Sequence, residues 1–336
     1  MVGEIVAVDA QVLERLKNGS FQGVVHSVFA RVVNIASRNG TEEALYPLAH
    51  REGDGGPGCL IAAVEDFSLL PIGQGDAVRV MHACLLVGEA VFRFHHAVPR
   101  QAERLAYPAD TACLRRNLRF LADLRLFPGA VGALGGEKAE QTPFARKVRR
   151  LLLERAYALA AALQDGNETE AAERAACLLG FGPGLTPSGD DILLGLSAAL
   201  AVENAPGASL CHFRRAVTEQ AARATNLISA AGIREAARGR MRASIAAFVR
   251  ALLHEDCESA RRRLQQVLEI GSSSGADIAW GIVLGMEVNL FLGCPMGAGH
   301  SMFCQPGAIT TKKPFPLRAF PFSPAWLRPV PGHARQ

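Results

Sequence analysis

The sequence predicts an α+β protein, with a β-rich N-terminal domain followed by an all-α domain. Up to about residue 98 the apolar runs are short, rich in Val and Phe, and separated by Gly and Pro clusters. From Asp110 the apolar residues, mostly Ala and Leu, recur with a helical period. Beyond His300 neither period is present. We therefore expect a β-rich domain over residues 1–105, a helical domain over 106–299 and a tail over 300–336.

Three apolar runs carry the β prediction. FQGVVHSVFARVVNIAS (21–37) is rich in Val and Phe, and CLIAAVEDFSLL (59–70) is a short buried-type run. GDAVRVMHACLLVGEAVFRF (75–94) has the pattern of a hairpin that turns at Gly88-Glu89. Glycine and proline clusters at 53–58 and 70–75 mark the turns between the runs.

Start signals define several helices of the second domain. A first helix covers 110–127 and stops at Pro128-Gly129. Thr142 as N-cap with Pro143 at the first helical position predicts a helix through about Leu163. Asn167 with Glu170 three residues later predicts another helix start. The remaining helical patterns cover about 188–202, 208–238, 240–254, 256–270 and 275–291.

The positive charge of the chain is concentrated in its tail. Residues 300–336 hold five Lys and Arg, no acidic residue and seven prolines, so we expect an extended, proline-rich segment. The whole chain has 36 Lys and Arg against 32 Asp and Glu, so residues 1–299 carry 31 against 32, about −1. This balance excludes a nucleic-acid footprint in the body of the chain.

Composition also predicts the compartment. Eight cysteines are scattered without CxxC pairs or metal-ligand spacing, which favours reduced thiols. The N-terminus lacks the basic start and continuous apolar core of a signal peptide. The apolar stretch 276–293 contains Asp277, Glu287 and Asn289, so a buried core helix is expected there rather than a membrane span. We expect a soluble cytoplasmic protein that engages neither membrane nor nucleic acid.

The most informative segment is GFGPGLTPSGDDILLGLSAAL, residues 180–200. Its part SGDDILLGLSAAL (188–200) aligns without gaps on SGADIAWGIVLGM (274–286), with Ser-Gly, an Asp, the following Ile and a later Gly in common. Each copy follows a Gly-containing loop. The repeat predicts two helices whose N-termini approach each other across a pseudo-two-fold axis.

Capping explains part of this pattern. Ser188 with Asp191, and Ser274 with Asp277, fit two S-x-x-D capping boxes. Capping explains neither Asp190 nor the GPGLTP lead-in, and exposed N–H groups at such a helix start attract phosphate or carboxylate. Two aspartates would repel an anion unless a divalent cation lay between them. Either the loop amides bind an anion, or Asp190 and Asp191 hold Mg²⁺ against it.

These considerations define the candidate site. The candidate catalytic residues are the acids Asp190, Asp191 and Asp277. Candidates for substrate binding, by close backbone approach or by a hydroxyl, are Gly182, Gly184, Thr186, Ser188, Gly189, Ser274 and Gly275. The metal is unknown, with Mg²⁺ on Asp190 and Asp191 as the possibility considered. No nucleophile-elbow motif is present to support hydrolase chemistry.

GFGPGLTPSGDD, SSGADIAWGIVLG and HSVFARVVNI (26–35) resemble the motifs of a bacterial family that includes the AllH subunit of oxamate carbamoyltransferase. The resemblance spans about 20–292, and GPGLTPSGDD is its most specific element. It implies a part in the last steps of allantoin breakdown, where oxalurate and phosphate are interconverted with oxamate and carbamoyl phosphate by three kinds of subunit. It also favours substrate binding by His26 and Ser27, for which a satisfied core histidine is the alternative.

The leading function is therefore a subunit of a carbamoyltransferase-type enzyme, with a small anionic substrate and the other subunits as partners. Preorganised N–H groups and hydroxyls suit such a reaction, because negative charge develops on a carbonyl oxygen and on phosphate. Two alternatives stay open: a phosphate- or small-molecule-binding module without turnover, and a structural partner subunit. The tail after His300 has no counterpart in the resemblance.

Overall fold

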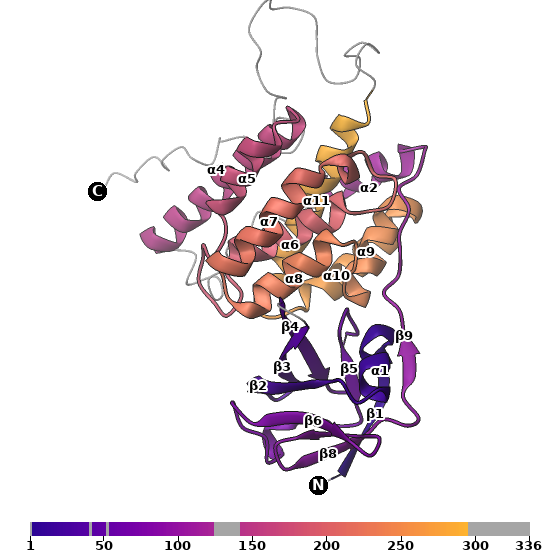
Figure 1. Cartoon of the computed structure of the whole chain (residues 1–336). Coiled ribbons are helices and arrows are strands. Elements are labelled where there is room, and N and C mark those ends of the chain that lie inside the picture. The colour runs from indigo at the N-terminus through magenta and orange to yellow at the C-terminus, as the bar shows by residue number, and fades with distance from the viewer. Residues whose placement is uncertain (1, 40–41, 52–53, 124–141, 295–336) are drawn as a thin grey trace, which may run out of the picture.

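A computed structural model describes residues 2–39, 42–51, 54–123 and 142–294 of the chain (Figure 1). It shows an α+β protein in which a β-barrel region precedes a helical region, as predicted. The proline-rich tail predicted from residue 300 and the predicted helix end at Pro128 lie outside the described residues.

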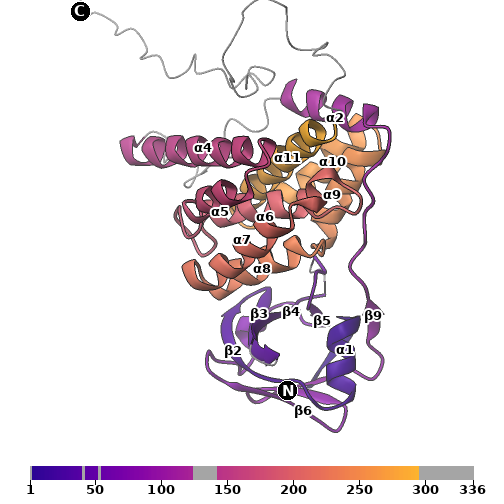
Figure 2. The same ribbon diagram turned by 45° about the horizontal axis from the view of Figure 1, so that its top comes forward.

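The N-terminal region is a nine-stranded sheet closed into a barrel. The strands run in the order β5-β4-β3-β2-β6-β7-β8-β1-β9, and pairing of β5 with β1 closes the ring. Figure 2 looks into this ring, with α1 along one side of it. The strands are β1 (Val2–Asp9), β2 (Gln22–Phe29), β3 (Val32–Asn39), β4 (Glu42–Ala49), β5 (Leu60–Ala62), β6 (Ala77–Met81), β7 (Cys84–Val87), β8 (Ala90–Arg93) and β9 (Val98–Arg100).

The barrel interior is filled by buried apolar side chains, Phe21, Phe67 and Phe92 among them. Helix α1 (Ala10–Lys17) adds Val12 and Leu16 to the same core. The sequence did not predict this helix. Its start is stabilised by Asp9, whose side chain accepts a hydrogen bond from the backbone N–H of Gln11 at 2.9 Å.

Two predicted strand runs contain more turns than expected. The run 21–37 is a hairpin of β2 and β3 rather than one strand. The run 75–94 forms three strands: the turn at Gly88-Glu89 is confirmed, and a second turn lies at His82 and Ala83. His82 and Ala83 have φ of 49° and 59°, as a tight two-residue hairpin turn requires. That turn lacks the usual Asn or Gly, so the sequence carries no signal for it.

The helical region contains nine described helices and one short 3-10 turn, η2; the other 3-10 turn, η1 (Phe67–Leu69), belongs to the barrel. The helices that follow the barrel are α2 (Ala112–Asp123), α4 (Pro143–Gln164), α5 (Glu168–Ala176), α6 (Ser188–Leu200), α7 (Cys211–Ala224), α8 (Leu227–Ala237), α9 (Ala243–His254), α10 (Cys257–Leu268) and α11 (Ser274–Leu292), with η2 (Pro206–Ser209) between α6 and α7.

Two predicted helix starts are confirmed. The Thr142 hydroxyl accepts from the N–H of Ala145 at 3.1 Å, and the Asn167 side chain accepts from the N–H of Glu170 at 3.2 Å. The single helix predicted over 208–238 is wrong. It is two helices, α7 and α8, because Thr225 is extended and Asn226 caps a new helix by accepting from the N–H of Ser229 at 3.0 Å.

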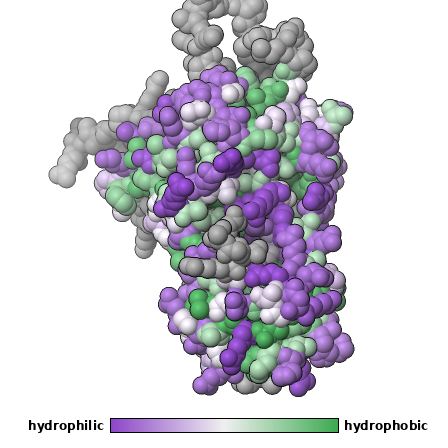
Figure 3. Space-filling view, in the orientation of Figure 1, coloured by the Kyte–Doolittle hydropathy of each residue, from purple (hydrophilic) through white to green (hydrophobic). Residues whose placement is uncertain are grey.

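Polar contacts join the two regions. Arg240, beyond the end of α8, forms an ion pair of 2.7 Å with Asp9 at the end of β1. Asp54 accepts from the backbone N–H of Ser244 at 2.9 Å, and Arg234 donates to the carbonyl oxygen of Glu43 at 3.0 Å. On the face shown in Figure 3, hydrophilic side chains gather where the two regions meet.

Helices α6 and α11 form the centre of the helical region. Both are apolar on all sides, and α4, α8, α10 and η2 pack around them. In the described part of the chain, α11 is the single helix long and apolar enough to cross a membrane. It is 72% buried within the protein over its most apolar window, which is what a core helix shows.

Glycines bring α6 and α11 into backbone contact. A Cβ at Gly195 would lie 2.0 Å from the carbonyl oxygen of Ile278, and a Cβ at Gly281 would lie 2.2 Å from that of Ile192. These contacts are reciprocal, because the repeat aligns Gly195 with Gly281 and Ile192 with Ile278. Contacts also advance together along both helices, from Gly281 at Ile192 to Gly285 at Leu196. The helices therefore run parallel, related by a pseudo-two-fold axis, and their N-termini lie together as the repeat predicts.

Replacing Gly281 by Ala should lower the free energy of unfolding by about 3 kcal/mol or more, because neither backbone can retreat from the added methyl group. Gly73→Ala is the matched control, since its Cβ would meet nothing closer than 3.7 Å. Urea unfolding measures both variants. Equal stability of the two would contradict the close parallel packing.

Candidate functional site

The loop before α6 has a backbone that only glycine adopts readily. Gly182 and Gly184 have φ of 117° and 105°, in the left-handed region. A Cβ at Gly182 would also lie 2.9 Å from the backbone nitrogen of Ser188. The loop therefore folds tightly over the first turn of α6, and the side chain of Asn226 anchors it by donating to the carbonyl oxygen of Leu185 at 2.9 Å.

The predicted capping boxes are wrong. Helix α6 begins at Ser188 with Pro187 as its N-cap, and α11 begins at Ser274 with Ser273 as its N-cap. Neither helix has a side-chain cap hydrogen bond. Instead, the N–H of Gly189 donates to the carbonyl oxygen of Phe181 at 2.9 Å, and the N–H of Gly275 donates to that of Ile270 at 2.9 Å. Backbone carbonyl oxygens of the preceding loops therefore accept these hydrogen bonds in place of the predicted serine caps. Asp191 and Asp277 do not act as capping residues.

Asp190 is held inside the protein. It is 2% exposed, and its carboxylate accepts from the N–H of Gly180 at 2.8 Å and from the hydroxyl of Thr225. The first contact fixes the start of the glycine loop, and the second fixes the end of α7. We expected Asp190 to face a ligand, but this geometry assigns it to positioning the loop.

Asp191 occupies the position between the two helix starts. It is 4% exposed, and its Oδ2 has no hydrogen-bond partner among the described residues. Burial raises the pKa of Asp191 to about 7; hydrogen bonding from Ser274 and Thr186 opposes the shift, and the nearby charges of Asp277 and Asp190 add to it. A carboxyl group with this pKa exchanges its proton near neutral pH, which is the property required of a general acid or base.

Asp277 is the counterpart of Asp191 in the repeat and is fully buried at the start of α11. The two helix starts are joined by a hydrogen bond of 2.7 Å between the hydroxyls of Thr186 and Ser274. The junction of the two helix starts thus contains two carboxyl groups, two hydroxyls and two helix N-termini. The positive ends of both helix dipoles stabilise negative charge there, which offsets part of the cost of burying the acids.

The loop presents backbone donors beside this pair. In the described part of the chain, the N–H groups of Gly182, Gly184, Leu185 and Ser188 donate no hydrogen bond. Gly184 and Leu185 are exposed, and Gly182 is half-buried. Consecutive free N–H groups in such a loop can bind the oxygens of an anion.

His26 and Ser27 lie in the other region of the molecule, at an irregularity in β2. Their side chains contact each other at 3.1 Å between Nδ1 and Oγ, and Ser27 also accepts from Asn34 at 3.0 Å. These contacts satisfy Ser27 within the barrel. The structure brings Gly182, Thr186, Ser188, Asp190, Asp191, Ser274 and Asp277 together at the paired helix starts, and substrate contact by His26 and Ser27 stays a prediction.

Two observations bear on the magnesium possibility at Asp190 and Asp191. Within residues 2–39, 42–51, 54–123 and 142–294, no group of three or more His, Cys, Asp and Glu side chains could hold a metal ion. The carboxylate of Asp190, one of the two proposed ligands, already accepts two hydrogen bonds. The seven cysteines in these ranges are free thiols.

The candidate site defined from the sequence contains neither Thr225 nor Asn226. Both follow from the break between α7 and α8 that the helical pattern concealed. The sequence does contain a signal for this break. Asn226, preceded by Thr225, stands three residues before Ser229, which is a helix N-cap signature inside an otherwise helical run.

The pKa of Asp191 predicts how stability depends on pH. Because its pKa is raised in the folded state, the folded protein binds more protons than the unfolded chain between pH about 4 and about 7. The contribution of Asp191 to the free energy of unfolding is therefore fully present below pH about 4, and it is lost as the pH rises through about 7. Asp191→Asn should remove this loss, so thermal unfolding of the variant should lie above that of the parent at pH 8. A parallel pH profile for the two proteins would contradict the shifted pKa.

Asp190→Asn should instead destabilise the protein, by about 1–3 kcal/mol, because an amide cannot accept from both Gly180 and Thr225 as a carboxylate does. Asp165→Asn, at an exposed position, is the control and should change stability by about 0.5 kcal/mol or less. Chemical unfolding at pH 7 compares them. An unchanged Asp190 variant would show that Asp190 is not a structural tie.

Two family models match this chain. One, described as oxamate carbamoyltransferase subunit AllH, matches residues 178–286, which include both helix starts. The other, described as the AllH family N-terminal domain, matches residues 4–100, which form the barrel. No solved structure matches the chain. The two models together cover both regions of the fold, and the chain belongs to the AllH family.

Proposed function

We propose that the chain is a subunit of a carbamoyltransferase-type enzyme and that its paired helix starts form a substrate site. The family description names an oxamate carbamoyltransferase subunit, which supports this class and implies other subunits as partners. The observation that carries the proposal is the buried Asp191 carboxyl, with a pKa of about 7, next to a loop of free N–H groups.

The reaction proposed is oxalurate with phosphate giving oxamate and carbamoyl phosphate. A phosphate oxygen forms a bond to the ureido carbonyl carbon of oxalurate, and the bond from that carbon to the oxamate nitrogen breaks. The leaving nitrogen takes up one proton, while hydrogen phosphate gives one up, so no net proton is released. A group that can both accept and donate a proton near neutral pH serves this exchange.

Asp191 is suited to that role. Its pKa of about 7 leaves comparable fractions of acid and carboxylate at neutral pH, so it can protonate the leaving nitrogen and regain a proton from phosphate. Asp277 lies near enough for its charge to add to the raised pKa of Asp191. The hydroxyls of Thr186 and Ser274, 2.7 Å apart, face Asp191 and orient it.

The loop N–H groups would hold the oxyanion. Negative charge develops on the carbonyl oxygen in the transition state, and fixed donors stabilise it without reorganising. The N–H groups of Gly182, Gly184 and Ser188 have no other partner in the described residues, and α6 adds the positive end of its dipole. We further propose that the protein is cytoplasmic and serves allantoin catabolism.

The test is phosphate-dependent cleavage of oxalurate by the chain assembled with its partner subunits. Asp191→Asn should lower kcat by about 100-fold or more, because the amide cannot transfer a proton. Asp165→Asn, the exposed control, should leave kcat unchanged. Circular dichroism and assembly with the partners verify that both variants are folded.

Full activity of Asp191→Asn in the assembled enzyme would contradict the catalytic role. The chain would then be a binding or structural subunit. Binding of phosphate by the isolated chain, without an effect of Asp191→Asn on turnover, would identify it as a binding module.

A further inference from the structure

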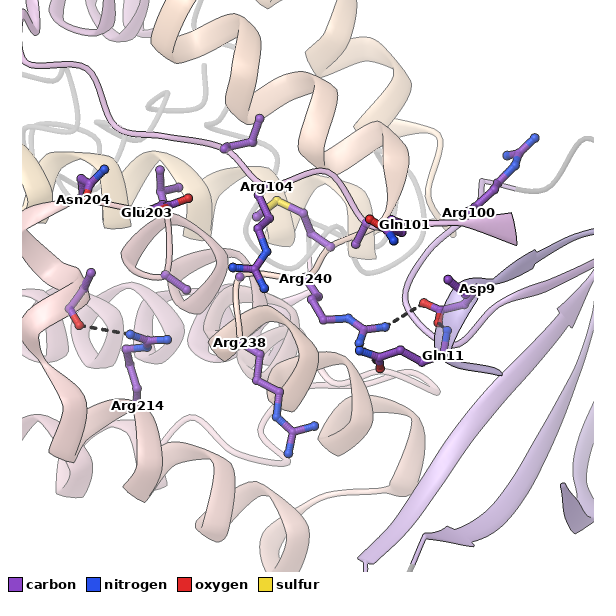
Figure 4. Close-up of a pocket in the computed structure, with 18 residues that line it drawn as sticks. Asp9, Gln11, Arg100, Gln101, Arg104, Glu203, Asn204, Arg214, Arg238 and Arg240 are labelled. Carbon is purple, nitrogen blue, oxygen red and sulfur yellow. Dashed lines mark hydrogen bonds and ion pairs between the residues drawn. The ribbon is translucent and has the colours of Figure 1, made fainter. Parts of the chain in front are cut away.

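A cleft lies between the two regions of the molecule, away from the paired helix starts. It has a volume of about 550 Å³ and is lined by the end of β1, the segment after β9, the segment after α6, and the end of α8. Ligand sites in proteins commonly have this size and this position between domains. The cleft is drawn in Figure 4.

The lining of this cleft is strongly basic. Only two acidic residues, Asp9 and Glu203, lie among the residues that line it, so the arginines exceed the acids by three formal charges. The lining arginines are Arg100, Arg104, Arg214, Arg238 and Arg240. This excess is local, since residues 1–299 as a whole carry almost no net charge.

Internal contacts account for only part of the basic charge. Arg240 pairs with Asp9 at 2.7 Å and with Glu235 at 3.1 Å, and Arg238 pairs with Glu235 at 3.2 Å. Arg214 donates to the carbonyl oxygens of Ala237 and Ala208, which are uncharged acceptors. These pairs hold the cleft walls in place and leave the charge of Arg214 without a carboxylate among the described residues.

Two of the lining arginines, Arg100 and Arg104, have no internal contact among the described residues that explains them, and Arg104 is the one that faces the cleft. It is exposed and has no hydrogen bond or ion pair in the described part of the chain. Figure 4 shows its guanidinium pointing into the cleft, between Arg214 on one side and Arg240 on the other. An oxyanion placed there would meet the unpaired guanidinium fork of Arg104, whose geometry fits phosphate and carboxylate oxygens. The positive charges of Arg214 and Arg240, whose nitrogens donate to internal partners, would add to the attraction.

We propose that this cleft binds a small anion bearing a phosphate group or paired carboxylates. The site is distinct from the paired helix starts. Helix α8 separates them: Asn226 at its N-terminus anchors the glycine loop, and Arg238 at its C-terminus lines the cleft. The 11 residues of α8 span about 16 Å. The anion would contact both regions of the molecule and therefore stabilise their junction.

Anion binding at the cleft does not depend on the proposed reaction, because the isolated chain can bind the anion. Isothermal titration calorimetry and thermal unfolding, with inorganic phosphate and with malonate as separate probes, test it. The parent should bind at least one of them and unfold at a higher temperature in its presence. The probe that binds distinguishes a phosphate ligand from a dicarboxylate ligand.

Arg104→Gln should weaken that binding by at least tenfold, and Arg104→Lys should weaken it less, because charge is kept and the fork is lost. Arg215→Gln is the matched control, since Arg215 neighbours Arg214 on α7, is largely exposed and does not line the cleft. Asp191→Asn should leave binding of the probe at the cleft unchanged.

The proposal would be overturned if the parent bound neither phosphate nor malonate, or if Arg104→Gln and Arg215→Gln bound the probe equally well. It would also be overturned if binding of the probe were lost in Asp191→Asn and kept in Arg104→Gln. The last result would place the anion at the paired helix starts. Absence of carbamoyl transfer in the assembled enzyme would contradict the proposed function and leave the cleft result standing.

Discussion

The backbone contact between α6 and α11 is the constraint on which the rest of the structure depends. Glycines at equivalent places in the two halves of the repeat let each helix approach the carbonyl oxygens of the other. Larger residues would separate the helices by several ångströms. At that distance the hydroxyls of Thr186 and Ser274 would no longer meet at 2.7 Å, and the two buried acids would no longer share one environment.

Parallel packing has an electrostatic cost that the acids offset. Two helix dipoles that run side by side in the same direction repel, and their positive ends coincide where both helices begin. Negative charge at that place is stabilised by both dipoles, whereas burial disfavours it. The balance raises the pKa of Asp191 to about 7 instead of excluding the charge. The same packing that completes the core therefore produces a proton-exchanging group, and the pseudo-symmetry supplies Asp277 as its counterpart.

Much of this arrangement could be predicted from the sequence, because local patterns express it. The repeat of Ser-Gly-x-Asp predicted two helix starts that lie together, and Thr142-Pro143 predicted the start of α4. What could not be predicted depends on contacts between distant residues. Asp190 accepts from Gly180 and Thr225, and the latter lies 35 positions away, so adjacent acids that look alike in sequence have different roles. The α7–α8 break was missed because the sequence on both sides of it has a helical pattern.

The grouping of arginines at the cleft could not be predicted from the sequence either, because it depends on contacts between distant residues. Residues 9, 104, 214 and 240 meet only because the barrel and the helical region are joined at their polar junction. No spacing in the chain signals this convergence, and a charge count over the body of the chain hides it.

The proposed chemistry depends on Asp191, a buried carboxyl group whose pKa burial raises to about 7. Carbon-13 NMR of protein labelled at the aspartate carboxyl carbons, recorded from pH 4 to pH 9, measures this pKa directly. The account predicts one aspartate resonance that titrates at about pH 7 and is missing from Asp191→Asn. A spectrum in which every aspartate titrates below about pH 5, as unperturbed carboxyl groups do, would contradict it.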